Sequence, residues 1–346
     1  PAGRADLSDE SDGDNFGSED CLEQALLRPS WLRHCDSRPP VARQVTQVPP
    51  RPAARPRVEP PLVAREPQRD NVNALPREIV IAPRQATVVA QLEAAGFVVI
   101  TRATVGGGEM LRLRVPAGMT TAEGLALARR LVPDAIIDLN HIYRPAQAVC
   151  TSPICRQRRA IRWPEPPREC AAEATIGLID TTIDRSQAAL AGQRIEVVRS
   201  ISLGRTPAST SHATAIASLL VGRSDATVPG LLPRGRLVAV ESFHRSDSGE
   251  DIADTFDVVR SLDLALARGL TVINLSFTGP NNKVLAEAVR VAVAKGVFLI
   301  AAAGNLGPTG PVVYPAGYES VVAVTAVGDD LRVYRGSNRG SFIDFS

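Results

Sequence analysis

The chain has 346 residues, 44% of them hydrophobic, and a formal net charge of +2. This length accommodates two compact domains or one large domain with appendages, and the apolar content supports a sizeable core. The near-balanced charge gives no whole-chain argument for binding nucleic acid or an acidic membrane. No apolar run reaches the ~18 residues of a membrane helix, so no membrane-spanning segment is predicted. Because the sequence begins at Pro1 and not at Met, its start says nothing firm about targeting.

Five cysteines lie outside every segment with regular periodicity: Cys21, Cys35, Cys150, Cys155 and Cys170. An odd number cannot pair completely within one chain. Their placement is more typical of disulfides formed in an oxidising compartment than of buried thiols, with free cysteines as the alternative. A zinc site is a further alternative, although the spacing is not that of a four-ligand cluster.

Residues 1–77 are predicted to be largely disordered. The first 20 are acidic and have no apolar period. A short amphipathic segment follows between the first two cysteines. Residues 38–70 are dense in Pro and Arg, which favours an extended, solvated linker, with contact to an acidic surface as the alternative.

Residues 78–144 show the patterns of a small α+β domain. Strands are expected at 78–82, 97–102, 110–115 and 135–139, and helices at 87–95 and 120–131. The order β-α-β-β-α-β is that of the ferredoxin-like fold. After it, residues 145–173 are rich in Pro and Cys and are interpreted as a connector.

Residues 174–346 alternate apolar strands with helices. Strands are expected at 175–179, 236–242, 271–275, 297–302 and 321–326, and helices at 213–221, 252–267 and 283–294. Near-continuous apolar strands joined by helices indicate an α/β fold, a parallel sheet with helices on both faces. In such sheets the functional site lies at the carboxyl ends of the strands.

Three polar residues occur where that rule predicts a site. Asp180 directly follows a strand, where a carboxylate can orient a histidine. His212 lies at the start of a helix, where the helix dipole disfavours a positive charge. A role as a neutral general base would explain a histidine at this position. Asn305 follows another strand beside Gly304 and could donate to a developing oxyanion. Taken singly, each has an ordinary structural interpretation as a turn, cap or surface residue.

Together these motifs resemble the subtilisin family of serine peptidases. The segments 176–184 and 211–221 resemble its aspartate and histidine motifs, and 274–280 resembles its substrate-binding strand. The segment 301–305 resembles its oxyanion segment, and 337–346 the stretch that precedes its catalytic serine. The order Asp, His, then Ser is that of this family and not of chymotrypsin-like enzymes.

The resemblance implies roles for these residues. Asp180 would orient His212, His212 would be the general base, and Asn305 would donate to the oxyanion. Ser276, Phe277, Thr278 and Gly279 would pair with the substrate as an added strand. Ala302, Ala303 and Gly304 would form one wall of the main specificity pocket, and residues 246–249 would form the facing strand. No cofactor and no metal are implied.

Some positions depart from the family pattern. Thr182 and Ala213 replace glycines that usually follow the aspartate and histidine, so the turn after Asp180 is expected to differ. Thr278 stands where glycine is common and is expected to narrow the cleft. No serine lies in the expected Gly-Thr-Ser-type motif, and Ser341 and Ser346 belong to the preceding stretch. The peptidase domain is therefore expected to be incomplete, with the serine encoded beyond residue 346.

The position of the small α+β domain resembles that of the family's inhibitory propeptide. Residues 139–143 would then be the tail that lies in the active site, and processing is expected near Tyr143–Arg144. The other histidines receive ordinary interpretations: His34 in the N-terminal element, His141 in the tail, and His244 in a loop near the site, with substrate contact as an alternative.

The preferred function is a serine endopeptidase made as a zymogen, secreted or periplasmic, with a protein or peptide substrate and its own propeptide as partners. The alternatives are an inactive pseudopeptidase that keeps the peptide cleft, and a stand-alone inhibitor or interaction domain at residues 78–143. The retained Asp180, His212 and Asn305 favour the enzyme.

Overall fold

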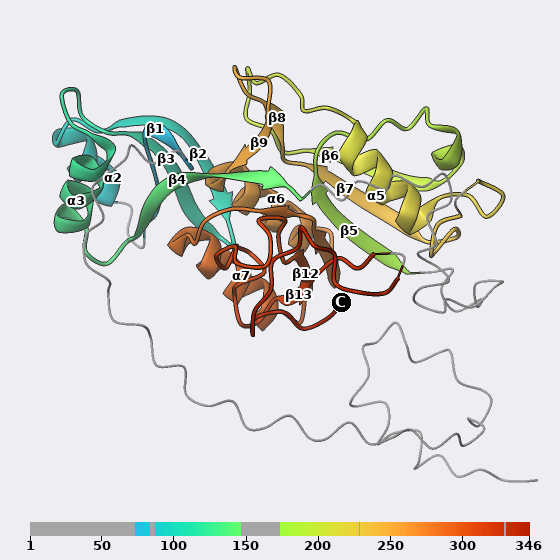
Figure 1. Cartoon of the computed structure of the whole chain (residues 1–346). Coiled ribbons are helices and arrows are strands. Elements are labelled where there is room, and N and C mark those ends of the chain that lie inside the picture. Colours follow the sequence, from blue (N-terminus) through green and yellow to red (C-terminus); the bar gives the residue numbers. More distant parts are fainter. Residues whose placement is uncertain (1–72, 84–86, 147–173, 228, 329) are drawn as a thin grey trace, which may run out of the picture. The chain divides into compact units, whose positions relative to one another are not determined.

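A computed structural model describes residues 73–83, 87–146, 174–227, 229–328 and 330–346 (Figure 1). All of them belong to one structural unit, Arg57–Ser346. The expectations for the first 72 residues, for the connector 147–173 and for all five cysteines lie outside the described residues.

The first elements form an antiparallel sheet. They are β1 (Ala74–Ala82), α2 (Thr87–Ala94), β2 (Val98–Val105), β3 (Gly108–Arg114), α3 (Thr121–Leu131) and β4 (Ile136–Pro145). The strand order is β2-β3-β1-β4, and each neighbouring pair is antiparallel. Ile79, Ile81 and Leu111 of this sheet share a buried cluster with Leu92 of α2 and Ala128 of α3. Both helices therefore bury their apolar sides against the sheet.

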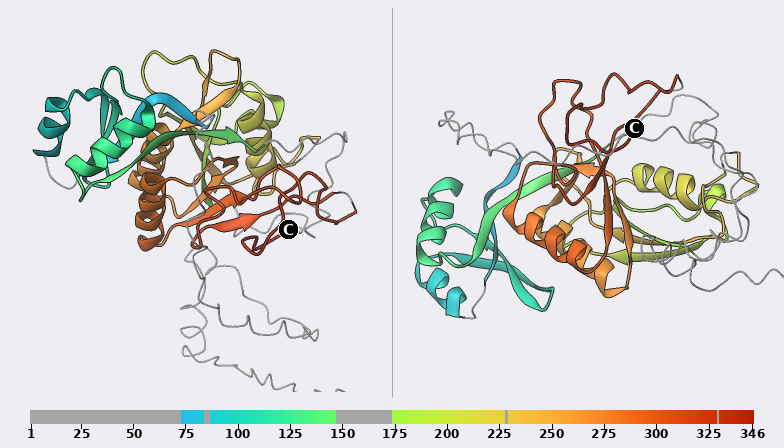
Figure 2. Two further views of the ribbon diagram at one scale, coloured as in Figure 1. Left: turned by 60° about the vertical axis from the view of Figure 1, so that its left-hand side comes forward. Right: turned by 90° about the horizontal axis from the view of Figure 1, so that it is seen from below.

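The later elements form a six-stranded parallel sheet with the order β13-β12-β10-β5-β7-β6. Its strands are β5 (Thr175–Asp180), β6 (Arg194–Arg199), β7 (Arg236–Glu241), β10 (Val272–Leu275), β12 (Phe298–Ala302) and β13 (Val322–Val324). The helices are η3 (Ala188–Leu190), α5 (Ser211–Val221), α6 (Thr255–Ala267) and α7 (Lys283–Ala294). The predicted parallel α/β sheet is confirmed (Figure 2).

Both faces of the parallel sheet are covered by helices. Leu178, Leu237 and Ala239 pack in one buried cluster with α5. Their sequence neighbours Ile179 and Val238 pack in another, which contains α6 and α7. Successive strand residues point to opposite faces, so strands buried on both sides must be apolar throughout. This is why they read as continuous apolar runs in the sequence.

Three details differ from the sequence expectations. The edge strand β6 was not predicted. Residues 252–254 are not helical but belong to β9 (Asp251–Asp254), because Asp254 is the N-cap of α6 and accepts from the Asp257 backbone N–H at 3.0 Å. Residues 246–249 are not a strand either: they form the turn between β8 (His244–Arg245) and β9.

Strand β4 continues past the small sheet (Figure 1). Its first half pairs with β1, whereas Ile142 and Tyr143 pair with β9, and Arg144 and Pro145 pair with β11 (Phe277–Thr278). All these pairings are antiparallel. The pairing of β4 thus connects the small sheet to β9 and β11 of the larger domain.

Two side chains of β4 meet helix N-termini of the larger domain. The Asp138 carboxylate accepts from the Lys283 backbone N–H at 2.8 Å, at the start of α7. The Asn140 side-chain oxygen accepts from the Phe256 N–H at 3.4 Å, at the start of α6. Helix N-termini have unsatisfied N–H groups and a partial positive charge, so both contacts stabilise the packing of the domain on these helices.

A buried cluster of charges links β1 and β3 with β9 and the start of α6. Arg112 of β3 forms a two-point ion pair with Glu78 at 2.6 and 3.0 Å, and lies 3.5 Å from Asp254. Arg205 contacts the same Asp254 at 2.5 Å and Asp257 at 3.3 Å. The Arg205 guanidinium also lies 3.0 Å from the His244 ring. Burial, and to a smaller extent the charge of Arg205, lowers the pKa of His244 to about 4. Burial, and to a smaller extent the charge of Asp254, raises the pKa of Asp257 to about 6.

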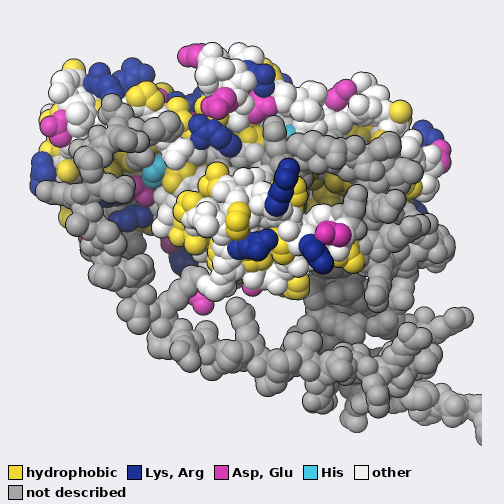
Figure 3. Space-filling model, in the orientation of Figure 1, with side chains coloured by type: hydrophobic (Ala, Val, Ile, Leu, Met, Phe, Trp, Pro, Cys, Tyr) yellow, Lys and Arg dark blue, Asp and Glu magenta, His cyan; other side chains and the backbone are white. Residues whose placement is uncertain are grey.

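The exposed surface carries mixed charges. On the face drawn in Figure 3, basic and acidic side chains are interspersed, which agrees with the net charge of +2. Among the described residues, no helix is long and apolar enough to cross a membrane.

Replacing Arg112 with Ala should cost about 3 kcal/mol or more of unfolding free energy, because Glu78 would stay buried without its guanidinium partner and Asp254 would keep only Arg205. The matched control is Arg102→Ala on the neighbouring strand β2, whose ion pairs with Glu93 and Glu109 are half-exposed; its cost should stay below about 1 kcal/mol. Urea unfolding of the 346-residue chain measures both. Equal losses would contradict a stabilising role for the cluster.

His244→Gln tests the pH dependence of the cluster. Since the folded pKa of His244 lies near 4, below the ~6.5 of an unfolded histidine, its contribution is present above pH 6.5 and is lost as pH falls towards 4. Asp257 has the opposite pH dependence: its contribution to the unfolding free energy is lost as pH rises through about 6. The difference in unfolding free energy between wild type and variant should therefore shrink by roughly 2–3 kcal/mol from pH 7 to pH 4. A constant difference would refute this assignment.

Candidate active site

The predicted site residues lie at the carboxyl edge of the parallel sheet. Strand β5 is central, with β7 on one side and β10 on the other. From β5 the chain first builds β6 and β7 and then crosses to β10, so the end of β5 is a topological switch point. Asp180 is the last residue of β5, and Ser276 and Ala302 lie at the ends of β10 and β12. The sheet thus brings these positions to one edge.

Asp180 and His212 form a hydrogen bond. Asp180 is 2% exposed, and its Oδ1 accepts from His212 Nδ1 at 2.7 Å and from the Thr181 N–H at 2.7 Å. The other carboxylate oxygen, Oδ2, is buried and has no hydrogen-bond partner among the described residues. The carboxylate is therefore held by the backbone on one oxygen and orients the imidazole through it.

The second ring nitrogen of His212 contacts the chain itself. Nε2 lies 3.1 Å from the backbone oxygen of Ala146. A carboxylate and a carbonyl can only accept, so both ring nitrogens donate and this arrangement favours the imidazolium. Burial acts to lower the pKa of His212, but the hydrogen bond and charge of Asp180 and the bond to Ala146 outweigh it, and the pKa is raised above 6.5.

The start of α5 is held against the end of β5. Thr181 Oγ1 accepts from the Ala213 N–H at 3.1 Å, and Thr214 Oγ1 accepts from the Asp184 N–H at 2.8 Å. Thr210 occupies the N-cap but makes no side-chain capping bond, so Thr181 satisfies a free helix N–H from outside the helix. Sequence reasoning missed this role; the only signal was a hydroxyl directly after Asp180.

The turn after Asp180 contains no residue with positive φ. Among the described non-glycine residues, only Arg77 and Leu331 have positive φ. Thr182 therefore needs no left-handed conformation at the position where the family usually has glycine.

The predicted binding strand is occupied by the end of β4. The Ala146 N–H donates to the Ser276 backbone oxygen at 2.8 Å, and Thr278 lies opposite Arg144 in the register. Gly279 continues this edge and exchanges two backbone hydrogen bonds with Tyr314. The facing strand is β9, which pairs with Ile142 and Tyr143. The pairing along this edge therefore reaches Ala146, beyond the segment 139–143 expected from the sequence, and no sequence signal marked Ala146.

The segment predicted to stabilise the oxyanion follows β12. Ala302 is half-buried, Ala303 is buried and Asn305 is exposed. Gly304 has φ +101°, and an added Cβ would lie 2.9 Å from Val313. Fully buried Asn338 holds this turn: its N–H donates to the Gly304 oxygen at 3.0 Å and its Oδ1 accepts from the Leu306 N–H at 2.7 Å. Asn338 is thus a positioning residue for this loop.

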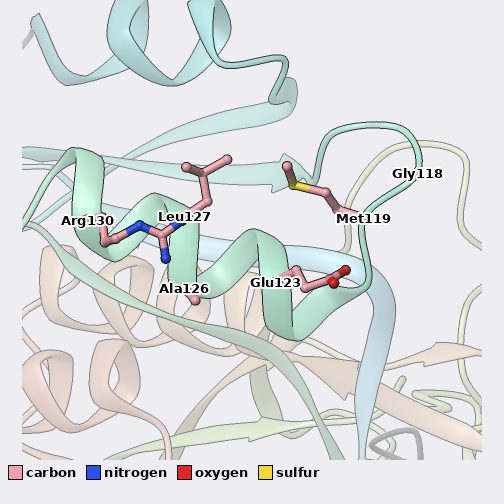
Figure 4. A pocket seen from close by; sticks show the side chains of 6 residues that line it. All are labelled: Gly118, Met119, Glu123, Ala126, Leu127 and Arg130. Carbon is pink, nitrogen blue, oxygen red and sulfur yellow. The ribbon is translucent and has the colours of Figure 1, made fainter.

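The two other described histidines lie outside the Asp180–His212 pair. His141 is buried and its Nδ1 accepts from the Asn282 amide at 2.9 Å, while Asn282 caps α7. His244 is part of β8 and of the buried charge cluster, and is not the loop residue expected. A pocket on α3, lined by Gly118, Met119, Glu123, Ala126, Leu127 and Arg130, contains none of the predicted site residues (Figure 4). Within the described segments, no three His, Cys, Asp or Glu side chains are placed to hold a metal ion.

Asp180→Asn should lower the pKa of His212, because the carboxylate charge that favours the imidazolium is removed. In wild type the His212 ring should titrate above 6.5, and in the variant below the wild-type value. NMR titration of the ring protons measures this, with His244, which should titrate near pH 4, as internal control. An unchanged His212 titration would contradict the proposed orientation by Asp180.

Comparisons with known proteins agree with this geometry. Residues 171–346 match the model of the subtilase family. Subtilisin DY of Bacillus licheniformis is 34% identical over 180 residues, 49% of this chain and 60% of that protein. The minor extracellular protease Epr of Bacillus subtilis is 32% identical over 137 residues, 39% of this chain and 21% of that protein. The chain thus spans less than two thirds of the length of each of these relatives.

Among solved structures, fervidolysin from Fervidobacterium pennivorans, described as a keratinolytic enzyme related to subtilisin, superposes with a TM-score of 0.62. The superposition covers 80% of this chain and 47% of fervidolysin. The sequence identity is 18%, so the likeness concerns the fold alone. The family match covers half of the chain and contains the Asp180–His212 pair. The chain therefore belongs to the subtilase family.

Proposed function

We propose that the protein is a serine endopeptidase of the subtilisin type, made as a zymogen with residues 78–144 as its propeptide domain. The single observation that supports this best is the hydrogen bond between the buried Asp180 carboxylate and His212 at the carboxyl edge of the parallel sheet. A buried carboxylate bonds one ring nitrogen at 2.7 Å, and the other nitrogen faces a peptide carbonyl at 3.1 Å. A carboxylate that orients a histidine through one ring nitrogen leaves the other nitrogen available for proton transfer once the Ala146 carbonyl no longer accepts from it.

In the proposed reaction, His212 Nε2 takes the proton of a serine hydroxyl while that oxygen attacks the substrate carbonyl. Asp180 orients the ring and stabilises the imidazolium. Asn305 donates to the oxyanion, and His212 returns the proton to the leaving nitrogen, after which water hydrolyses the ester. None of the described serines hydrogen-bonds to His212, so the nucleophile has no assignment among the described residues.

Substrate binding is proposed to use the strand edge that β4 now occupies. Ser276, Phe277, Thr278 and Gly279 would pair with a peptide as an added strand, since backbone hydrogen bonds at such an edge do not depend on side chains. Ala302, Ala303 and Gly304 would form a wall of the specificity pocket. The protein would then accept extended peptide segments.

The propeptide role is supported by the strand order of the small sheet and by the path of β4. The order β2-β3-β1-β4 with two helices agrees with a ferredoxin-like domain. Its last strand lies along the proposed binding edge, and the Ala146 carbonyl that follows it favours the protonated form of the base that catalysis needs neutral. Zymogen synthesis would prevent cleavage before export, and the name of the extracellular relative Epr supports a secreted or periplasmic location.

The test is peptide hydrolysis by the protein expressed from its complete reading frame, with labelling by a fluorophosphonate probe. His212→Ala should reduce kcat/KM at least roughly 10³-fold and abolish labelling, since the serine would lose its base. Lys295→Ala, exposed at the end of α7 and before β12, is the control and should retain wild-type rates. If wild type neither hydrolyses casein nor takes the label, the peptidase assignment is wrong and an inactive peptide-binding module is favoured.

A further inference from the structure

A short antiparallel ribbon connects the end of β4 to the segment that precedes α5 (Figure 1). Strand β9 pairs with β4 on one side and with β8 on the other. On the far side of β8, His244 forms an isolated antiparallel bridge with Pro207. Pro207 lies a few residues before α5, so the ribbon ends close to the helix that carries His212.

Asp251, the first residue of β9, connects this ribbon to the start of the helix. Its Oδ1 accepts from the Ser209 backbone N–H at 3.0 Å, and its Oδ2 accepts from the Ser209 hydroxyl. Thr210, the next residue, is the N-cap of α5 but makes no side-chain capping bond. The orientation of the first helical turn, and of His212 in it, therefore depends on contacts from outside the helix, and Asp251 supplies two of them.

The Asp251 carboxylate is largely buried and stays ionised. Its side chain is 12% exposed, and the Arg245 guanidinium of β8 contacts Oδ1 at 2.8 Å. Burial acts to raise the pKa of Asp251, but the hydrogen bonds from Ser209 and the contact with Arg245 outweigh it, and the pKa lies below its ordinary value. A negative charge is therefore held beside the start of α5 at neutral pH.

This charge acts on His212. Burial lowers the pKa of the ring, and two carboxylates oppose it: Asp180 of β5 through a hydrogen bond and its charge, and Asp251 of β9 through its charge. Arg245 of β8 carries the opposite charge and offsets part of the effect of Asp251. The ring is therefore subject to charges from the parallel sheet and from the ribbon.

We infer that Asp251 is a positioning residue for His212: it holds the first turn of α5 through Ser209, and its charge, partly offset by Arg245, stabilises the protonated ring. This role rests on the proposed function, because the position of His212 affects a reaction only if His212 is the base. It adds a residue of β9 to the Asp180–His212 pair, and no sequence signal marked it.

The first experiment measures the titration of His212 by NMR in the 346-residue chain. Asp251→Asn keeps an oxygen that can accept from Ser209 but removes the charge, so the pKa of His212 should fall by at least about 0.3. Arg245→Gln leaves the Asp251 charge without its partner, so the pKa of His212 should rise. General loosening of the site would weaken the bond to Asp180 and lower the pKa in both variants. Shifts that are not of opposite sign therefore overturn the role of the charge.

Asp225 supplies the matched control for the titration. It is an exposed aspartate that accepts from Arg223 at 2.7 Å, beyond the other end of α5. Because solvent and salt screen such a surface charge, Asp225→Asn should change the pKa of His212 by less than about 0.1. A shift as large as that of Asp251→Asn would show a general effect of charge on the chain and overturn the specific role of Asp251.

The second experiment measures peptide hydrolysis by the protein expressed from its complete reading frame. Asp251→Ala removes the acceptor for Ser209, so kcat should fall at least about tenfold while KM changes less than about threefold. Asp251→Asn retains an acceptor and should keep at least about a third of the wild-type kcat. Asp225→Ala should retain wild-type rates.

The outcomes separate this role from the proposed function. Wild-type kcat in Asp251→Ala, in an enzyme that digests casein, overturns the positioning role and leaves the peptidase assignment intact. No casein hydrolysis by the wild type overturns the proposed function, and with it the catalytic meaning of Asp251, while the titration still decides whether its charge acts on the ring. If Asp251→Ala does not fold, the signs of the shifts in Asp251→Asn and Arg245→Gln remain the decisive result.

Discussion

Strand β4 is the constraint on which the rest of the arrangement depends. Its first half completes the antiparallel sheet with β1, and its second half pairs with β9 and β11 around the parallel sheet. A strand has one register, and a slip by one residue would turn every side chain to the opposite face. Pairing with β1 therefore also determines which residue of the tail reaches His212.

Side-chain contacts between β4 and the larger domain also fix that register. Asp138 and Asn140, two residues apart on β4, contact the starts of α7 and α6. The Glu78–Arg112–Asp254–Arg205 cluster adds charge pairs that link β1 and β3 with β9 and with Arg205 of the larger domain. Unpaired charges are costly in a buried site, so this cluster disfavours other placements of the small sheet more than it adds to stability.

The contact of the Ala146 oxygen with His212 also affects the protonation of the ring. An acceptor on each ring nitrogen favours the imidazolium, which cannot take a proton from a nucleophile. Departure of the tail would remove one acceptor and leave Asp180 to orient a neutral ring. In the proposed zymogen, occupation of the cleft and protonation of the base are therefore one event.

The sequence by itself determined the local patterns. Apolar runs predicted the parallel strands, since burial on both faces leaves no polar period. Asp180 was identified from its place at the end of a strand, and His212 from its place in the first turn of a helix. It also determined the order of elements in the small domain. These features depend on residues that are close together in the chain, so a sequence pattern can predict them.

Only the tertiary structure decided what depends on residues far apart in sequence. Residues 252–254 read as helix because their apolar content suits either element, and pairing with β4 made them a strand. Ala146 carries no pattern of its own, yet its backbone lies at His212 because β4 holds it there. The partnership of Arg112 with Asp254, and of Asp251 with Ser209, arises in the same way. Such contacts join elements that no local periodicity links, and backbone hydrogen bonds leave no trace in side-chain identity.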